Sequence, residues 1–403
     1  MIVGLPAFLS RAEPQCPYLR TGQNYADTIT AHMNEGPEEA SLTRRQVLAL
    51  AATTVLSAAG CASTTPGSRS PGGSPLPRPE SADPPIIYST DLSHPHVDPD
   101  DHFDLAVAHG LGLDVQTVIL DQHLAIGAVP GMAPITQLNA LTGRRWPASD
   151  GLPKPLRSLS DRGDDQAGDR DAVTAVLNAL RHSKASVIIV GSCRDIAAAY
   201  NSDPGLFHER IERLVIFAGE ASLPGAVEYN VGLDPLAFVR LMGSGLPIRW
   251  VPCFDGGPWQ AGRHASFVQV PQALLLPSDL PPPLIRYFVY MARRETSDPI
   301  EFLDRPITTD DWQLLHSGQR NLWGGPLLAT GDGDGEVRFD GKIVGLFEPV
   351  TARFNAAGAV DETGSVAASV ERWRVLDRPA WERAMVAGVV TALRQIPIIA
   401  AFR

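Results

Sequence analysis

From residue 86 onward, short apolar runs alternate along the chain with longer segments of helical hydrophobic period. Runs of a few residues rich in Val and Ile predict strands, and the longer periodic segments predict amphipathic helices. This alternation indicates βαβ units, whose strands pair in parallel and are covered by helices. The sequence therefore predicts an α/β fold, with a mostly parallel open sheet and helices on both faces. In such a sheet the ligand site lies at the carboxyl ends of the strands.

The predicted elements are spread over the whole segment from 86 to 395. Strands are expected at 86–90, 115–120, 186–190, 213–218 and 248–253. Helices are expected at 103–111, 171–182, 194–201 and 234–243. Polar strands are expected around 337–355 and 366–376, followed by a helix at 378–395. No internal repeat is visible, which favours one domain over an array of similar units.

The first 85 residues differ in character from the rest. Residues 62–85 form a tract of Ser, Pro and Gly, which buries too little apolar surface to fold and predicts an extended tether. Before it, Arg44 and Arg45 precede an uncharged, Ala-rich run that ends at Ala59. This run is shorter than the ~20 residues that a permanent membrane helix needs. The paired arginines and the modest apolar run resemble a twin-arginine export signal.

The signal-like segment leads directly into Cys61, in a context of small residues that resembles a bacterial lipoprotein box. The resemblance implies that Cys61 is the acylated residue; the alternative is a membrane-anchoring or buried helix. We expect residues 1–60 to be a leader and signal, 61–85 a linker, and 86–403 the folded domain. This predicts an exported protein, periplasmic or held by a lipid anchor on the outer side of the cytoplasmic membrane. Both Met1 and Met33 stand as candidate starts.

Charge and cysteine content exclude several classes of protein. The chain has 34 Lys and Arg against 45 Asp and Glu, a net charge of −11, so it lacks the basic balance of a nucleic-acid-binding protein. Its 4 cysteines are too few for a disulfide scaffold. Cys193 and Cys253 are expected to be small buried hydrophobic residues, with a disulfide between them after export as the alternative.

The segment after the first predicted strand is unusually acidic. Between residues 91 and 104 it contains five aspartates and three histidines, namely Asp91, Asp98, Asp100, Asp101, Asp104, His94, His96 and His102. So many carboxylates in one loop repel each other unless a positive charge lies among them. Oxygen ligands suit a hard cation such as Ca²⁺. The alternative is a solvated acidic loop that caps the next helix.

This loop resembles the amino-terminal signature of the inosine–uridine-preferring nucleoside hydrolases, in which a strand, an Asp, a short turn, an Asp-Asp pair and a helix form a calcium and ribose site. Asp91 matches the first aspartate, and Asp100 and Asp101 match the pair. The chain departs from the pattern by inserting residues within 94–98. The additional histidines would favour Zn²⁺ or another borderline ion over Ca²⁺.

Further matches follow in the same order and extend the resemblance over residues 86–395. Residues 191–197 resemble a family turn whose Thr gives a backbone carbonyl to the metal, and Arg194 stands at that Thr position. The segment Glu228-Tyr229-Asn230, followed by Asp234-Pro235, resembles the Glu-Phe-Asn and Asp-Pro motif, whose Glu and Asn hold ribose hydroxyls. Residues 137–140 and 250–255 resemble a family helix and a later strand.

The largest departure comes late in the chain. The family has a His-Asp-Pro there, with the His near the leaving base and the Asp on the metal, whereas Trp323 and Gly324 stand in this chain. His316 and Asn321 are candidates to replace the missing proton donor. Trp323 is expected either to stack on a nucleobase or to fill the core.

The resemblance implies a metal-dependent hydrolase of the N-glycosidic bond of ribonucleosides or related ribosyl compounds. It implies Ca²⁺ as the cofactor, with another divalent ion as the alternative. Asp91 would be both base and metal ligand. The other implied roles are metal ligation by Asp101 and by the carbonyl of Arg194, and ribose binding by Asp100, Glu228 and Asn230.

Other interpretations stay open. The replacement of His-Asp by Trp323 and Gly324 favours an exported ribosyl- or sugar-binding protein without turnover, and the insertion would also fit a hydrolase with another substrate. The His94-x-His96 pair resembles the motif that opens amidohydrolase barrels. The spacing Asp332-x-Asp334-x-Glu336 fits a calcium loop or, more simply, a surface turn. Whether the protein is a homo-oligomer also stays open.

Overall fold

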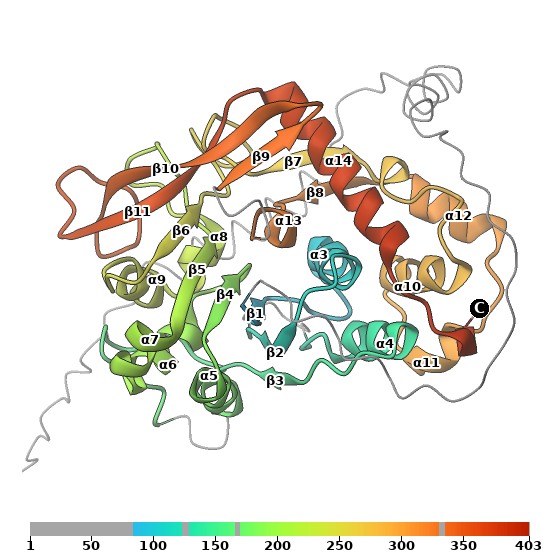
Figure 1. Ribbon diagram of the computed structural model, residues 1–403, viewed down its shortest axis with the longest axis horizontal. Helices are drawn as coiled ribbons and strands as arrows, with labels where there is room; N and C mark the ends of the chain where they lie inside the picture. The colour runs from blue at the N-terminus through green and yellow to red at the C-terminus, as the bar shows by residue number, and fades with distance from the viewer. Residues whose placement is uncertain (1–83, 123–128, 166–169, 330–334, 403) are drawn as a thin grey trace, which may run out of the picture. The chain divides into compact units, whose positions relative to one another are not determined.

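The computed structural model describes residues 84–122, 129–165, 170–329 and 335–402 (Figure 1). These residues belong to one compact unit, Arg78–Arg403. Arg44, Arg45, Cys61 and almost all of the linker lie outside the described residues, so export and lipidation stay predictions. Within the described part, no helix combines the length and the apolar character that a membrane span requires.

The main sheet has nine strands in the order β3-β2-β1-β4-β5-β6-β11-β10-β9 (Figure 1). Neighbouring strands are parallel from β3 to β11, and β10 and β9 complete the edge in antiparallel pairs. The strand bounds are β1 Ile86–Thr90, β2 Val115–Leu120, β3 Ala148–Asp150, β4 Ala185–Ile189, β5 Ile211–Phe217, β6 Ile248–Val251, β9 Glu336–Phe339, β10 Lys342–Phe354 and β11 Val366–Val375. A separate antiparallel pair is formed by β7 Val268–Pro271 and β8 Gln319–Leu322.

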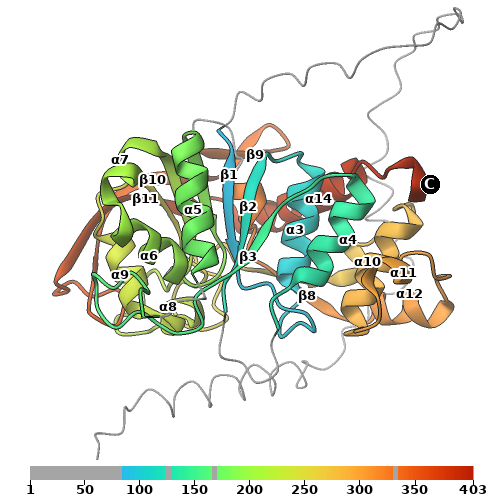
Figure 2. The same ribbon diagram turned by 90° about the horizontal axis from the view of Figure 1, so that it is seen from below.

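Helices cover both faces of this sheet, as Figure 2 shows from a second side. One group consists of α5 Asp171–His182, α6 Arg194–Ser202, α7 Pro204–Arg210, α8 Tyr229–Leu233 and α9 Pro235–Met242. The remaining helices are α3 Asp100–Gly110, α4 Met132–Thr142, α10 Pro282–Ala292, α11 Pro299–Phe302, α12 Thr309–His316, α13 Gly325–Ala329 and α14 Arg378–Gln395, with single 3₁₀ turns at Gln272–Leu274 and Ala400–Phe402. The α/β prediction, with a mostly parallel sheet and helices on both faces, is confirmed.

The two faces of the sheet bury separate hydrophobic cores, and β1 contributes to both. Ile86 and Tyr88 belong to the core under α3 and α14, whereas Ile87 belongs to the core under α5 and α6. This alternation follows from the two-residue period of a strand. A strand buried on both faces needs apolar residues at every position, which is why the strand segments read as continuous apolar runs.

Several predicted bounds differ from the observed ones for physical reasons. α3 begins at Asp100, earlier than the predicted 103, so the aspartate pair lies in the first turn, where the positive end of the helix favours carboxylates. Within the predicted polar segment 337–355 the chain turns back at Asp340 and Gly341, both with positive φ, and forms the β9–β10 hairpin. Cys193 and Cys253 are buried and free, so the disulfide alternative is wrong.

The strand order changes direction between β1 and β4. From β1 the chain adds β2 and β3 on one side, and from β4 it adds β5 and β6 on the other. In open α/β sheets, ligands bind beyond the carboxyl ends of the strands at such a switch point. Asp91 follows β1 there and Gly191 follows β4. A Cβ at residue 191 would lie 2.8 Å from the backbone nitrogen of Asp91, so only glycine allows the two strand ends to approach this closely.

Candidate functional site

Carboxylates converge at the carboxyl end of β1. Asp101 accepts a hydrogen bond from the Thr90 hydroxyl at 2.5 Å, and the charge of Asp91 acts on its carboxyl group. Burial, together with the charges of Asp121 and Glu228, raises the pKa of Asp91 to about 7, and the interaction with Asp101 opposes this rise. Two buried carboxyl groups in contact cannot both be ionised without a proton or a cation between them.

Asp100, the neighbour of Asp101 in the sequence, belongs to the same group of buried carboxylates. The pKa of Asp100 lies well above its usual range because of burial and because of the charges of Asp98 and Asp91. The pKa of Asp101 is raised well above its usual range by burial and then by Asp91 and Asp100. The structure thus brings together the three aspartates Asp91, Asp100 and Asp101, which lie apart in the sequence.

Glu228 and Asn230 lie at the start of α8. The carboxylate of Glu228 caps this helix: Oε1 accepts from the backbone N–H of Asn230 at 3.0 Å, and Oε2 accepts from those of Gly219 at 2.9 Å and Val231 at 3.3 Å. Burial raises the pKa of Glu228, and these hydrogen bonds oppose the rise. In contrast, Oδ1 of Asn230 is buried without a hydrogen-bond partner among the described residues.

Arg194 begins α6, and its side chain is completely buried. The guanidinium lies 3.5 Å from carboxylate oxygens of both Asp121 and Asp234. It donates to the carbonyls of Gln122 at 2.6 Å and Leu152 at 2.9 Å, and more weakly to that of Leu233 at 3.4 Å. Its positive charge is therefore balanced within the fold. Metal ligation by its carbonyl stays a prediction.

The inserted residues 94–98 contact a distant part of the chain. Asp98 lies 3.4 Å from Arg320 and 3.4 Å from Asn321, both on β8. The imidazole of His94 donates to or accepts from that of His102 at 3.4 Å, and its other nitrogen lies 2.6 Å from the carbonyl oxygen of Glu295. Burial lowers the pKa of His94 and lowers the pKa of His102 well below its usual range, so these rings are neutral at pH 7 and do not offset the aspartates.

The two candidate replacements for the missing proton donor have different positions. Asn321 is buried on β8 and contacts the inserted loop through Asp98. His316 is exposed at the end of α12, where its ring nitrogen lies 3.2 Å from the carbonyl oxygen of Leu276. No contact of His316 with the aspartates is among its interactions.

An aromatic cluster borders the carboxylates. It contains Phe254, Trp259, Phe267 and Trp323, packed beside Cys253. The Trp323 ring lies 4.8 Å from that of Phe267 and 5.3 Å from that of Phe254. Burial raises the pKa of the Cys253 thiol well above its usual range, and Glu228, Asp100 and Asp91 raise it further, which places this cluster within electrostatic reach of the acidic group. Trp323 is half-buried in it.

The donor chemistry of the acidic group fits a divalent cation. All its side-chain donors are oxygens, which suits Ca²⁺, and its buried negative charge lacks a neighbouring cation strong enough to restore normal pKa values. The unpartnered Oδ1 of Asn230 is a further oxygen donor without a protein partner. Yet in the described part of the chain, no three His, Cys, Asp or Glu side chains are placed to hold an ion together. The oxygen donors thus fit a cation in kind, but the described residues do not arrange three of these side chains as ligands.

Sequence reasoning missed three charged residues of this region. Asp121 directly follows β2, so the rule that led to Asp91 would also have identified it. Asp104 lies three and four residues after the aspartate pair, on the same face of α3, and this spacing was visible in the sequence. Arg320 carried no local signal, because its contact with Asp98 joins segments more than 200 residues apart.

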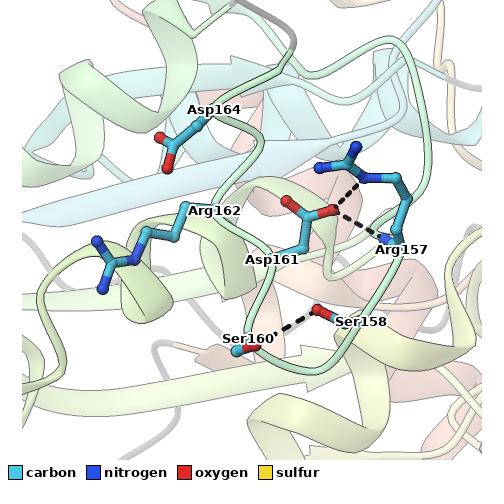
Figure 3. A pocket seen from close by; sticks show the side chains of 6 residues that line it. All are labelled: Arg157, Ser158, Ser160, Asp161, Arg162 and Asp164. Carbon is cyan, nitrogen blue, oxygen red and sulfur yellow. Dashed lines mark hydrogen bonds and ion pairs between the residues drawn. The ribbon is translucent and has the colours of Figure 1, made fainter.

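A surface hollow of about 560 Å³ lies away from these residues, in the loop between β3 and α5 (Figure 3). Its lining consists of Arg157, Ser158, Ser160, Asp161, Arg162 and Asp164. Asp161 pairs with Arg157 at 2.9 Å, and this hydrogen bond lowers the pKa of Asp161 to about 2. Asp164 pairs with Arg170 at 2.7 Å. Because most of its charges are neutralised internally, we assign no role to this hollow. Asp332 and Asp334 lie outside the described residues.

No protein-family model matches the chain, and no curated protein sequence is significantly similar to it. Solved structures with similar folds include the plant nucleoside hydrolase PpNRh1, at 15% identity over 76% of this chain and 99% of that chain, with a TM-score of 0.46. They also include a purine-preferring ribonucleoside hydrolase from Gardnerella vaginalis, at 14% identity over 77% and 99% with a TM-score of 0.44. A third is the type III effector XopQ, complexed with adenosine diphosphate ribose, at 16% identity over 78% and 95% with a TM-score of 0.42. Similarity this remote does not carry an activity over to this chain.

Proposed function

We propose that this protein is a metal-dependent hydrolase of the N-glycosidic bond of ribonucleosides or related ribosyl compounds. The observation that carries the proposal is the close approach of Asp91 and Asp101 at the carboxyl end of β1, where the Thr90 hydroxyl donates to Asp101 and the charge of Asp91 acts on it. Asp100 and Glu228 lie close enough to change the pKa values of this pair. Paired oxygen donors beside further carboxylates suit a cation and a vicinal diol.

The proposed base is Asp91. Asp91 directly follows β1 and lies beside Asp101, and a carboxylate in this position can take the proton of an attacking water molecule. Water attacks the anomeric carbon as the bond to nitrogen breaks, the electron pair leaves with that nitrogen, and the proton of the water passes to Asp91. A divalent ion held by Asp91, Asp101 and the carbonyl of Arg194 would orient the water and the sugar diol.

The remaining polar groups would hold the sugar. Oδ1 of Asn230 has no hydrogen-bond partner among the described residues and can accept a hydrogen bond from a ribose hydroxyl. Asp100 offers a second acceptor from the first turn of α3, and Glu228 holds the start of α8 in place through three backbone hydrogen bonds. A buried site that pairs both hydroxyls of a diol rejects substrates that lack one of them.

The leaving group would lie against the aromatic cluster, where Trp323 offers a ring face for stacking. Gly324 and Gly325 follow it and provide no side chain that could protonate a departing base. This absence favours a second candidate function, namely binding of a ribosyl or sugar ligand without turnover.

The test is to incubate the purified protein with a panel of ribonucleosides and to measure reducing sugar, after chelator treatment and again after Ca²⁺ is restored. We expect release that depends on the metal and is lost in Asp91→Asn but kept in Asp171→Asn, an exposed control on α5. Absence of release with every nucleoside and metal would refute the hydrolase. Tight ribose binding without release would select the second candidate.

A further inference from the structure

Glu220 is a buried carboxylate to which the proposed mechanism gives no role. It lies shortly after the end of β5, and only 4% of it is exposed. One of its oxygens, Oε1, accepts hydrogen bonds from the backbone N–H groups of Ser222 and Leu223, both at 2.9 Å, and from that of Gly256 at 2.8 Å. The other oxygen, Oε2, accepts from the N–H of Gly257 at 2.9 Å. A single side chain therefore joins the loop after β5 to the loop after β6.

The loop after β6 holds a tryptophan in an uncommon backbone conformation. Gly256 and Gly257 have φ angles of 103° and 119°, which glycine adopts without steric cost. Trp259 has a φ of 63°, in the left-handed region that a bulky side chain rarely occupies. Such a conformation raises the free energy of the folded state and persists only where surrounding contacts hold it, most often at ligand-binding sites. The hydrogen bonds from Gly256 and Gly257 to Glu220 are contacts of this kind.

Trp259 belongs to the accessible part of the aromatic cluster. Its ring lies 5.5 Å from that of Phe254 and 5.6 Å from that of Phe267, both of which are buried. It lies 6.4 Å from the Trp323 ring, and both tryptophans are only half-buried. The part of the cluster that a ligand can reach thus consists of two neighbouring indole rings. Indole rings offer a large flat surface on which a planar aromatic group stacks.

The end of β5 also connects this cluster to the proposed ribose contacts. Gly219 directly precedes Glu220, and its backbone N–H donates to Oε2 of Glu228 at 2.9 Å. The carbonyl oxygen of Gly219 accepts from the backbone N–H of Cys253, beside the aromatic cluster, at 2.9 Å. One short segment therefore contacts both the start of α8, where the sugar would be held, and the residues that carry the aromatic rings.

A role limited to folding of the loop explains less. Asp255 already closes the loop on itself: its Oδ2 accepts from the backbone N–H of His264 at 2.9 Å, and its own N–H donates to the carbonyl of Gln260 at 3.3 Å. Glu220 adds a connection to the neighbouring strand end, and this connection acts on the residues just before Trp259. The two roles differ in whether loss of the Glu220 carboxylate changes ligand binding through Trp259, and this difference can be measured.

We propose that Glu220 is a positioning residue that fixes Trp259 beside Trp323, and that the two rings form the binding surface for a planar aromatic leaving group. The inference rests on the proposed function, because it takes Glu228 and Asn230 as the sugar contacts. It narrows the substrates to ribosyl compounds whose leaving group is a flat heterocycle.

The experiment measures binding of adenine and, separately, of ribose to the full chain by titration calorimetry. Neither compound contains the bond that the proposed hydrolase would cleave, so binding is measured without turnover. Trp259→Ala should weaken adenine binding on the order of tenfold and leave ribose binding unchanged. Two controls should bind both compounds like the wild type: Trp312→Ala, at a half-buried tryptophan on α12, and Glu362→Gln, at an exposed position between β10 and β11.

A double-mutant cycle separates positioning from a general effect on the fold. Glu220→Gln should weaken adenine binding severalfold, and combining it with Trp259→Ala should weaken binding no further than Trp259→Ala alone. Gly256→Ala disturbs the same loop without changing Glu220. Its Cβ would meet no described atom within 4 Å beyond its chain neighbours, so only the positive φ opposes the substitution, and adenine binding should again weaken. Circular dichroism and thermal unfolding verify that each variant folds.

The outcomes separate this inference from the proposed function. Absence of adenine binding in the wild type, unchanged adenine affinity in Trp259→Ala or in Glu220→Gln, or additive losses in the double variant would each overturn the inference. If ribose is released from nucleosides in any of these cases, the hydrolase stands and the aromatic subsite is wrong. If the cycle behaves as expected but no nucleoside is cleaved, the inference is supported and the proposed activity is wrong.

Discussion

The most informative single substitution for the architecture of the site is Arg194→Met. The guanidinium of Arg194 is completely buried and lies 3.5 Å from Asp121 and from Asp234. It donates to backbone carbonyls in the loops after β2 and β3 and at the end of α8. Methionine fills similar volume but leaves both carboxylates buried without a positive partner. Removing one partner of a buried ion pair costs about 3–5 kcal/mol, whereas a domain of this kind is stable by only ~5–15 kcal/mol.

The assay is urea unfolding followed by circular dichroism, with chelator present so that metal binding does not contribute. We expect the free energy of unfolding of Arg194→Met to fall by about 3–5 kcal/mol. The control Arg383→Met, an exposed position on α14, should change it by no more than ~0.5 kcal/mol. Adding Asp121→Asn to Arg194→Met removes one stranded charge and should recover part of the loss. A loss below about 1 kcal/mol in Arg194→Met, or no recovery in the double variant, would refute the idea that this guanidinium holds the loops together.

Three further predictions concern the base, the aromatic cluster and pH. Asp91→Asn should lower ribose release by on the order of a hundredfold or more while the protein stays folded, and unchanged release would exclude Asp91 as the base. Trp323→Ala should raise KM for nucleosides by on the order of tenfold and leave inhibition by free ribose unchanged; an equal effect on both would place Trp323 in the core only. Burial raises the pKa of Asp195 to about 7 from an ordinary 3.8. As pH rises from about 4 to 7, Asp195 therefore ionises in the unfolded chain before it ionises in the folded one, and the free energy of unfolding should fall. Asp195→Asn should flatten this fall in urea unfolding measured across that range, and an unchanged slope would assign it to other carboxyl groups.

Local patterns predicted the centre of the fold well. The observed bounds of β1, β2, α5 and α14 equal the predicted ones, because each is a short apolar run or an amphipathic period with clear ends. The region from 268 to 329 was left without predicted elements. α10 begins at Pro282 and Pro283, where repeated prolines read as a turn, although proline is also favoured in the first turn of a helix.

The candidate site was predictable where a candidate residue directly follows a strand or begins a helix. Asp91, Asp100 and Asp101 meet these conditions, and the structure brings them together. The capping of α8 by Glu228 is also a local effect, since its partners include Asn230 and Val231. Contacts between distant segments left no such signal. The burial of the Arg194 guanidinium cannot be inferred from spacing, because it depends on the packing of helices against the sheet.

The two places where the chain departs from the nucleoside hydrolase pattern are in contact with each other. Asp98, within the inserted residues, lies 3.4 Å from Arg320 and 3.4 Å from Asn321, just before Trp323 and Gly324. Arg320 is anchored in turn by Gln272, whose side-chain oxygen accepts from its guanidinium at 3.0 Å and at 2.5 Å. Because Asp98 contacts both Arg320 and Asn321, the insertion and the late segment form one connected alteration of the fold.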